Sequence, residues 1–176
     1  MTAGSISAWS YGVALVVPLI VACVSDMRSR RIPNPVVLLT LFAGIVLAVA
    51  TKPWLSGLIF AGGGMLTGFA IWIPFYALGM LGAGDVKLFA AAATFLGARQ
   101  AVEGALYTAL YGGALAAIFM FANGGWSSTL FRIAHSPGQP MLLRQSPISN
   151  AHRTPYALAI AAGVLTALWW PGHILS

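Results

Sequence analysis

Residues 7–25 read SAWSYGVALVVPLIVACVS, carry no charged side chain and are followed directly by Asp26. An apolar run of about 20 residues is long enough to cross the hydrocarbon core of a bilayer as an α-helix. Further apolar runs, separated by short polar or Gly/Pro breaks, lie at about 35–51, 55–79, 85–98, 101–122 and 155–171. The sequence therefore predicts an all-α polytopic membrane protein with about six transmembrane helices.

The composition of the whole chain agrees with this prediction. Of its 176 residues, 59% are hydrophobic and 7% are charged, and the mean hydropathy is +0.87, whereas about 25% of the residues of a soluble domain are charged. One integral membrane domain, residues 1–176, accounts for the chain. The run at 85–98 is short for a full crossing, and a tilted or partly re-entrant helix buried in protein would also fit it.

The cationic side chains predict the orientation of these helices, because Lys and Arg near the ends of spans are retained on the cytoplasmic side. With six spans and an outside N-terminus, Lys52 and Arg99 lie outside. Seven cations then lie inside: Arg28, Arg30, Arg31, Lys87, Arg132, Arg144 and Arg153. This arrangement places both termini outside and brings Asp26 and Asp85 to the cytoplasmic face, with Glu103 on the opposite side.

The excess of basic residues is explained by this topology and by attraction to anionic lipid headgroups. No basic run is interleaved with stacking aromatic residues, so we expect membrane lipids as partners and no nucleic acid. The tryptophans mostly lie near the predicted span ends, where their amphipathic rings suit the headgroup layer. They include Trp54, Trp72, Trp126, Trp169 and Trp170.

Cysteine and histidine give no sign of a disulfide or a metal site. Cys23 is the only cysteine, and the preceding Ile20-Val21-Ala22 resembles a lipoprotein cleavage box, but residues 1–12 lack the Lys or Arg of an export signal. The three histidines show no metal-binding spacing, so no metal or cofactor is expected. The polar segment at about 123–154 should be a cytoplasmic loop with a short interfacial helix around Trp126–His135, which could border an active site or cover the bundle.

The first stretch with candidate chemistry is DMRSRRIPN, residues 26–34. It begins with Asp26 at the end of a predicted span, where the partial negative charge of a helix C-terminus disfavours an acid. Another interaction must therefore hold the carboxylate in place. A salt bridge to Arg28 or Arg30 would be a purely structural reason for it.

The second stretch is GAGDVK, residues 82–87. Gly82 and Gly84 allow a sharp bend and the close approach of another chain, and Asp85 is predicted to be the N-cap of the next helix. The structural alternative is that Asp85 is only a cap with Lys87 as its counter-ion. In a functional site, Gly82 and Gly84 would shape the approach of a substrate, while Lys87 and Arg28 would tune the local field or hold the substrate.

Two of the three acidic residues of the chain thus meet at one membrane face. Two neighbouring carboxyl groups cannot both ionise at low cost, so they share a proton, and one can act as base toward water and the other as acid toward a carbonyl. That is the apparatus of an aspartic protease. A small transporter or channel that relays protons or binds a cation through Asp26 and Asp85 is an alternative, as is a catalytically silent scaffold.

Both stretches resemble the signature of the type IV prepilin peptidases, and the Gly-x-Gly-Asp element of residues 82–85 is shared with presenilin-type proteases and archaeal preflagellin peptidases. Residues 155–161, PYALAIA, resemble a further segment of the family, with Ala157 where glycine is expected. The resemblance implies a membrane-embedded aspartic endopeptidase of the bacterial cytoplasmic membrane, with both termini periplasmic. Asp26 and Asp85 would be its catalytic pair and would cut leader peptides at the cytoplasmic face.

The chain departs from the larger members of that family in one respect. Those members insert a cytoplasmic domain with paired cysteines that accompanies N-methylation of the new pilin terminus, and this chain has neither the insertion nor the cysteines. It resembles the short, peptidase-only branch of the Tad/Flp pilus type. The substrate implied is a small prepilin or pseudopilin, cut just before its apolar segment, and no methyltransferase domain is expected.

Overall fold

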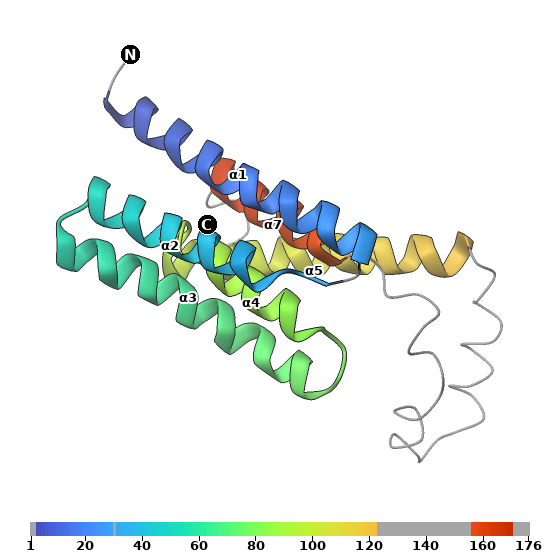
Figure 1. Ribbon diagram of the computed structural model, residues 1–176. Helices are drawn as coiled ribbons and strands as arrows, with labels where there is room; N and C mark the ends of the chain where they lie inside the picture. Colours follow the sequence, from blue (N-terminus) through green and yellow to red (C-terminus); the bar gives the residue numbers. More distant parts are fainter. Residues whose placement is uncertain (1–2, 30, 123–155, 171–176) are drawn as a thin grey trace.

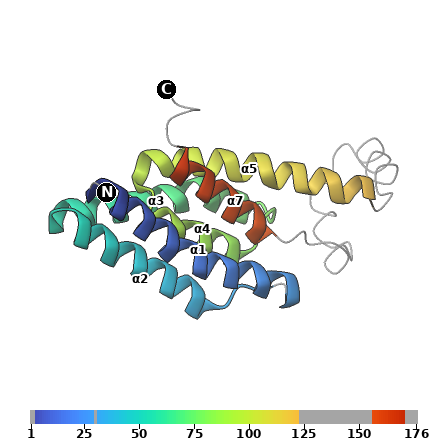
Figure 2. The same ribbon diagram turned by 90° about the horizontal axis from the view of Figure 1, so that it is seen from above.

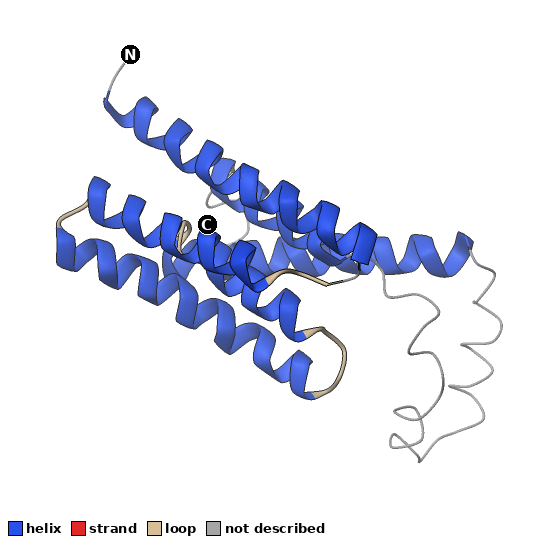
Figure 3. Cartoon of the chain, in the orientation of Figure 1, coloured by secondary structure: helices blue, strands red, loops and turns tan. Residues whose placement is uncertain are grey.

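The computed structural model describes residues 3–29, 31–122 and 156–170, and all regular structure in these ranges is helical (Figures 1 and 3). The helices are α1 (Ala3–Ser29), α2 (Asn34–Thr51), α3 (Trp54–Ala77), α4 (Ala83–Ala93), α5 (Gly97–Ala122) and α7 (Tyr156–Trp169). The predicted loop at about 123–154, with its short interfacial helix, lies outside the described residues.

Four of these helices are long and apolar enough to cross a membrane. The apolar stretches are Tyr11–Ser29 of α1, Asn34–Thr51, Trp54–Ala77 and Gly97–Ile118 of α5, and α7 is a shorter apolar helix of 14 residues. The prediction of an all-α polytopic membrane protein is therefore confirmed.

The helices run alternately in opposite directions (Figures 1 and 2). One end of the bundle gathers the end of α1, the start of α2, the connection between α3 and α4, and the start of α7. The opposite end holds the tight connection between α2 and α3. Lys52 is the C-cap residue of α2, and its Nζ lies 4.6 Å from the ring centroid of Phe60. Elements far apart in the sequence therefore meet at the first end.

Helix α4 is the buried centre of the bundle. It contacts α2, α3, α5 and α7, and every residue from Leu88 to Ala93 is buried. Its 11 residues span only about 16 Å, roughly half the thickness of a hydrocarbon core. The run predicted at 85–98 is thus a short helix buried in protein, followed by a turn and then by α5.

Close packing of the backbone allows α4 to fit at this depth. A Cβ on Gly64 of α3 would collide with the carbonyl oxygen of Ala93, and the turn after α4 ends at Gly97, whose φ of +72° favours glycine. Phe60 of α3 packs over the Cα of Gly97. The α4–α5 turn is therefore seated against the first half of α3.

The tryptophans whose side chains the structure describes divide into two groups, and Trp126 lies outside the described residues. Trp54, Trp169 and Trp170 are exposed at helix ends, as the sequence predicts for the headgroup layer. Trp72 is only 4% exposed and contacts the rings of Phe75, Phe89 and Tyr156, so its assignment to that layer is wrong. The α3 sequence is apolar on all sides, and its pattern does not distinguish the face against α4 from the face against lipid.

Candidate functional site

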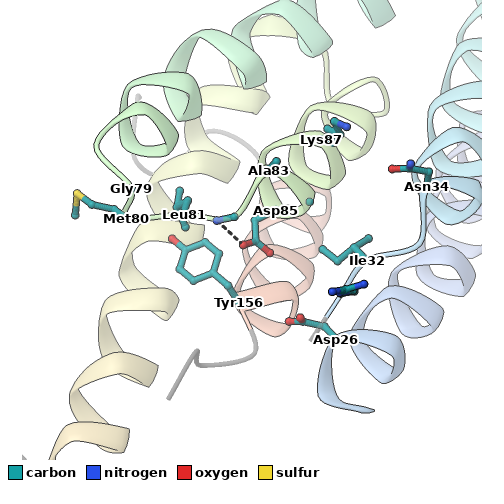
Figure 4. A pocket seen from close by; sticks show the side chains of 13 residues that line it. Asp26, Ile32, Asn34, Gly79, Met80, Leu81, Ala83, Asp85, Lys87 and Tyr156 are labelled. Carbon is teal, nitrogen blue, oxygen red and sulfur yellow. Dashed lines mark hydrogen bonds between the residues drawn. The ribbon is translucent and has the colours of Figure 1, made fainter. Parts of the chain in front are cut away.

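A cavity of about 520 Å³ opens at the end of the bundle where α1 ends and α2, α4 and α7 begin (Figure 4). Its wall combines the chain after α1, the α3–α4 connection and the first residue of α7. The lining residues are Asp26, Arg31, Ile32, Asn34, Gly79, Met80, Leu81, Gly82, Ala83, Gly84, Asp85, Lys87 and Tyr156. Asp26 and Asp85 therefore lie in one cavity, and both side chains are half-buried.

Asp26 lies in the last turn of α1 and is held there by α7. The backbone N–H of Ala157 donates a hydrogen bond of 3.3 Å to Asp26 Oδ2. The N-terminus of α7 also carries partial positive charge, which offsets the unfavourable negative end of α1. This contact supplies the stabilising interaction that the sequence required but did not identify.

The arginines after Asp26 are placed differently from the sequence expectation. Arg28 is exposed in the last turn of α1 and does not line the cavity, whereas Arg31 does. Arg30 lies outside the described residues. Arg31, which the sequence analysis did not select, is therefore the arginine at the cavity wall.

Asp85 is anchored to the turn that precedes its own helix. Gly82 is the N-cap residue of α4 and Asp85 is the third residue of the helix, so the prediction of Asp85 as the N-cap is wrong. The Gly82 N–H donates a 3.1 Å hydrogen bond to Asp85 Oδ2, and the Asp85 and Val86 N–H groups donate to the Gly82 carbonyl oxygen at 3.1 and 3.3 Å. The carboxylate thus reaches back across the helix start, as the acidic residue of a capping box does.

The two glycines of this turn pack against different neighbours. A Cβ on Gly82 would lie 3.0 Å from Asp85 Oδ2, and a Cβ on Gly84 would lie 3.4 Å from the Ile32 side chain. Gly82 leaves room for the reach of the carboxylate, while Gly84 lets α4 approach the chain that follows α1. Both glycines line the cavity.

Two further side chains define the cavity. Lys87 points away from the carboxylate of Asp85 in Figure 4, as expected for residues two apart on a helix. Tyr156 lies at the cavity wall, and its ring packs against Trp72 with a centroid distance of 6.1 Å. Tyr156 belongs to the PYALAIA segment, so a signal for it was present in the sequence, although no role had been assigned to it.

Glu103 and Cys23 do not line this cavity. Glu103 of α5 is 1% exposed and is absent from its wall, and Cys23 is a buried free thiol of α1. Within the described residues, no three His, Cys, Asp or Glu side chains gather in a way that could hold a metal ion. The arrangement offers two carboxylates in one cavity: Asp26 at the end of α1, bonded to the first turn of α7, and Asp85 in the first turn of α4.

Comparison with known proteins gave one match. Residues 13–121 match the type IV leader peptidase family, and this region includes the C-terminal end of α1, which carries Asp26, and the start of α4, which carries Asp85. No curated protein and no solved structure matched the chain.

Proposed function

This chain belongs to the type IV leader peptidase family, and on that basis we propose that it is an aspartic endopeptidase in which Asp26 and Asp85 form the catalytic pair. The observation that carries the proposal is their position in one cavity of about 520 Å³, although they come from different helices and lie far apart in the sequence. Family membership and four candidate membrane spans make the protein a membrane-embedded peptidase.

The chemistry follows from two carboxyl groups that share one proton. The ionised carboxylate removes a proton from a water molecule as the water oxygen attacks the carbonyl carbon of the scissile peptide bond. The protonated carboxyl donates its proton to the carbonyl oxygen, which yields a neutral tetrahedral gem-diol. As this intermediate collapses, the C–N bond breaks, the leaving nitrogen takes the proton that the first carboxylate removed from water, and one gem-diol hydroxyl returns its proton to the second carboxylate. The leaving nitrogen becomes the new amino terminus, and the pair again holds one proton.

The surroundings of the carboxylates supply the positioning that this chemistry needs. The Ala157 N–H fixes Asp26 and the Gly82 N–H fixes Asp85, and one oxygen of each carboxylate accepts these bonds. Gly82 and Gly84 keep the approach narrow but free of side chains, and Lys87 and Arg31 at the wall are suited to hold backbone carbonyl groups of a substrate.

The proposed substrate is a small prepilin or pseudopilin of the Tad/Flp type, cut just before its apolar segment. The cation bias of the sequence supports a cytoplasmic location for the cavity and periplasmic termini in a bacterial inner membrane. Arg28 and Arg31 lie at the cavity end of the bundle, while Lys52 lies at the other end. With a single cysteine, the chain lacks the paired cysteines that accompany methylation, and we propose peptidase activity without it.

The test is co-expression of the protein with small pilin-like precursors, followed by mass spectrometry of each precursor. We expect loss of a leader in the presence of the wild-type protein and an intact precursor in the presence of Asp85→Asn. A proton- or cation-coupled transporter, or a silent scaffold, would leave every precursor intact with the wild-type protein as well. That result would remove the peptidase proposal.

A further inference from the structure

A second hollow of about 370 Å³ lies beside the aspartate cavity, between α2, α3 and α4. We call it the apolar groove. Its walls are the first two turns of α2 and the middle of α3, with α4 as the floor. It is lined by Asn34, Val37, Leu38, Leu41, Met65, Phe69, Lys87 and Ala91, and its only polar side chains are Asn34 and Lys87.

The apolar groove adjoins the aspartate cavity. Asn34 and Lys87 line both hollows, so these two residues mark the junction. From this junction the groove follows α2 from Asn34 to Leu41 and α4 from Lys87 to Ala91. At 1.5 Å per residue, the stretch of α2 corresponds to about 10 Å, or two helical turns, away from the carboxylates.

This direction matches the shape of the proposed substrate. A precursor cut just before its apolar segment must place extended backbone at the carboxylates and then enter the bilayer as a helix. The part that is still extended needs hydrogen-bond partners at membrane depth. Asn34 and Lys87 lie at the junction, where the substrate would change from extended backbone to helix. Both side chains can donate hydrogen bonds to backbone carbonyl groups.

We propose that the apolar groove binds the first two turns of the apolar helix that follows the scissile bond, and so sets the position of the cut relative to the membrane. This inference rests on the proposed peptidase function and specifies where its substrate is held. In a bilayer, lipid tails are as apolar as the groove, so binding depends on close packing of helix against helix. The partly exposed rim residue Leu38 is suited to such contact.

Adjacent leucines of α2 provide a matched pair for the test. Leu38 lines the groove and is 50% exposed, while Leu39 is 60% exposed and is not part of the groove. Each is replaced singly by cysteine in a Cys23→Ser, Asp85→Asn background, which leaves one thiol and an uncut substrate. The probe is a precursor that the wild-type protein cleaves, carrying one cysteine within the first two turns of its apolar segment.

Under mild oxidation in membranes, we expect a disulfide-linked product with Leu38→Cys and little or none with Leu39→Cys. Equal cross-linking of both, or of neither, with a precursor that the wild-type protein does cleave would overturn the groove assignment and leave the peptidase function standing. Cross-linking of neither variant is the result expected if lipid acyl chains fill the groove. If the wild-type protein cleaves none of the precursors, the peptidase function is overturned, and selective cross-linking of a precursor through Leu38→Cys would then support docking alone.

A kinetic comparison tests the same groove in active protein. Leu38→Trp should fill the groove and raise KM several-fold for the full precursor, with kcat less affected, whereas Leu39→Trp should leave both unchanged. A soluble peptide that contains the cleavage site but no apolar segment should be cut equally by both variants. Equal KM values for the full precursor in the two variants would exclude the groove as a substrate contact.

Discussion

Asp26 stands at a position that its own helix disfavours, and a residue 131 positions later in the chain compensates for it. The Ala157 N–H belongs to the first turn of α7, whose donors have no partner within their helix. Asp85 lies in the first turn of α4, where the helix favours negative charge, and is held locally by the N–H of Gly82. Both carboxylates are therefore oriented by backbone donors, which hold their positions better than long flexible side chains.

If Asp26 and Asp85 are the catalytic pair, replacing either one should lower the rate of leader cleavage. Asp26→Asn and Asp85→Asn should each lower kcat for leader cleavage by about 10²–10⁴-fold, the usual contribution of general acid–base catalysis. Asparagine keeps an oxygen that can accept the Ala157 or Gly82 N–H, so membrane insertion and folding should be retained. Single-turnover cleavage of a precursor in detergent, with size-exclusion profiles of the variants, measures both properties.

Glu103→Gln is the control for these variants. It changes the only other carboxylate of the chain, which is buried in α5 and does not line the cavity, and it should leave the cleavage rate close to that of the wild type. Near-normal cleavage by either aspartate variant would remove that residue from the catalytic pair.

Helix α4 holds Asp85 in the cavity wall because the helix is short and its buried part consists mainly of small residues. The small side chains from Ala90 to Ala93 let α2 and α3 approach closely. Gly64 has no side chain that would collide with the carbonyl oxygen of Ala93. Small residues at helix contacts are typical of membrane bundles, in which close packing stabilises association. The depth at which Asp85 sits is therefore set by packing at the opposite end of its helix.

Two glycines of α3 test this packing with opposite outcomes. Gly64→Ala should lower the stability of the protein by about 1–3 kcal/mol, because the added Cβ collides with backbone that cannot move freely. Gly62→Ala has no neighbouring atom within 4 Å of its new Cβ and should raise stability by about 0.5–1 kcal/mol through helix propensity. Thermal unfolding in detergent compares the two. A Gly64→Ala protein as stable as Gly62→Ala would contradict the close α3–α4 contact.

The whole molecule has two chemically different ends. The cavity end carries both aspartates with Arg28, Arg31 and Lys87, while Lys52 lies at the end where α2 meets α3. This polarity is the basis for the proposed orientation in the membrane.

Thiol labelling tests that orientation. In a Cys23→Ser background, a cysteine at Ser56 should react with a membrane-impermeant maleimide in intact cells, and a cysteine at Ser29 should react only after permeabilisation. Both positions are exposed and lie at opposite ends of the bundle, so accessibility of the side chain alone does not separate them. Labelling of Ser29→Cys and protection of Ser56→Cys in intact cells would invert the proposed topology.

Much of this architecture could be predicted from the sequence because it depends on local composition. Apolar length predicts the helices, and the positions of Asp26 and Asp85 at the ends of spans predict that they meet. The donor to Asp26 could not be predicted, because a backbone N–H has no residue signature. The cap of α4 was misassigned because aspartate can fill either the N-cap or the third position of a helix, and Gly82 can also begin one.

The order in which the site is assembled follows from the contact between α7 and Asp26. During synthesis α1 is made well before α7, so Asp26 is made well before the N–H that holds it. Before α7 is synthesised, Tyr156 is also missing from the cavity wall. Until α7 is made, Asp26 lacks the support of that N–H, and the described arrangement of the two aspartates forms only after residue 157 has been synthesised. Such timing would keep a nascent protease inactive beside other chains that are being inserted into the same membrane.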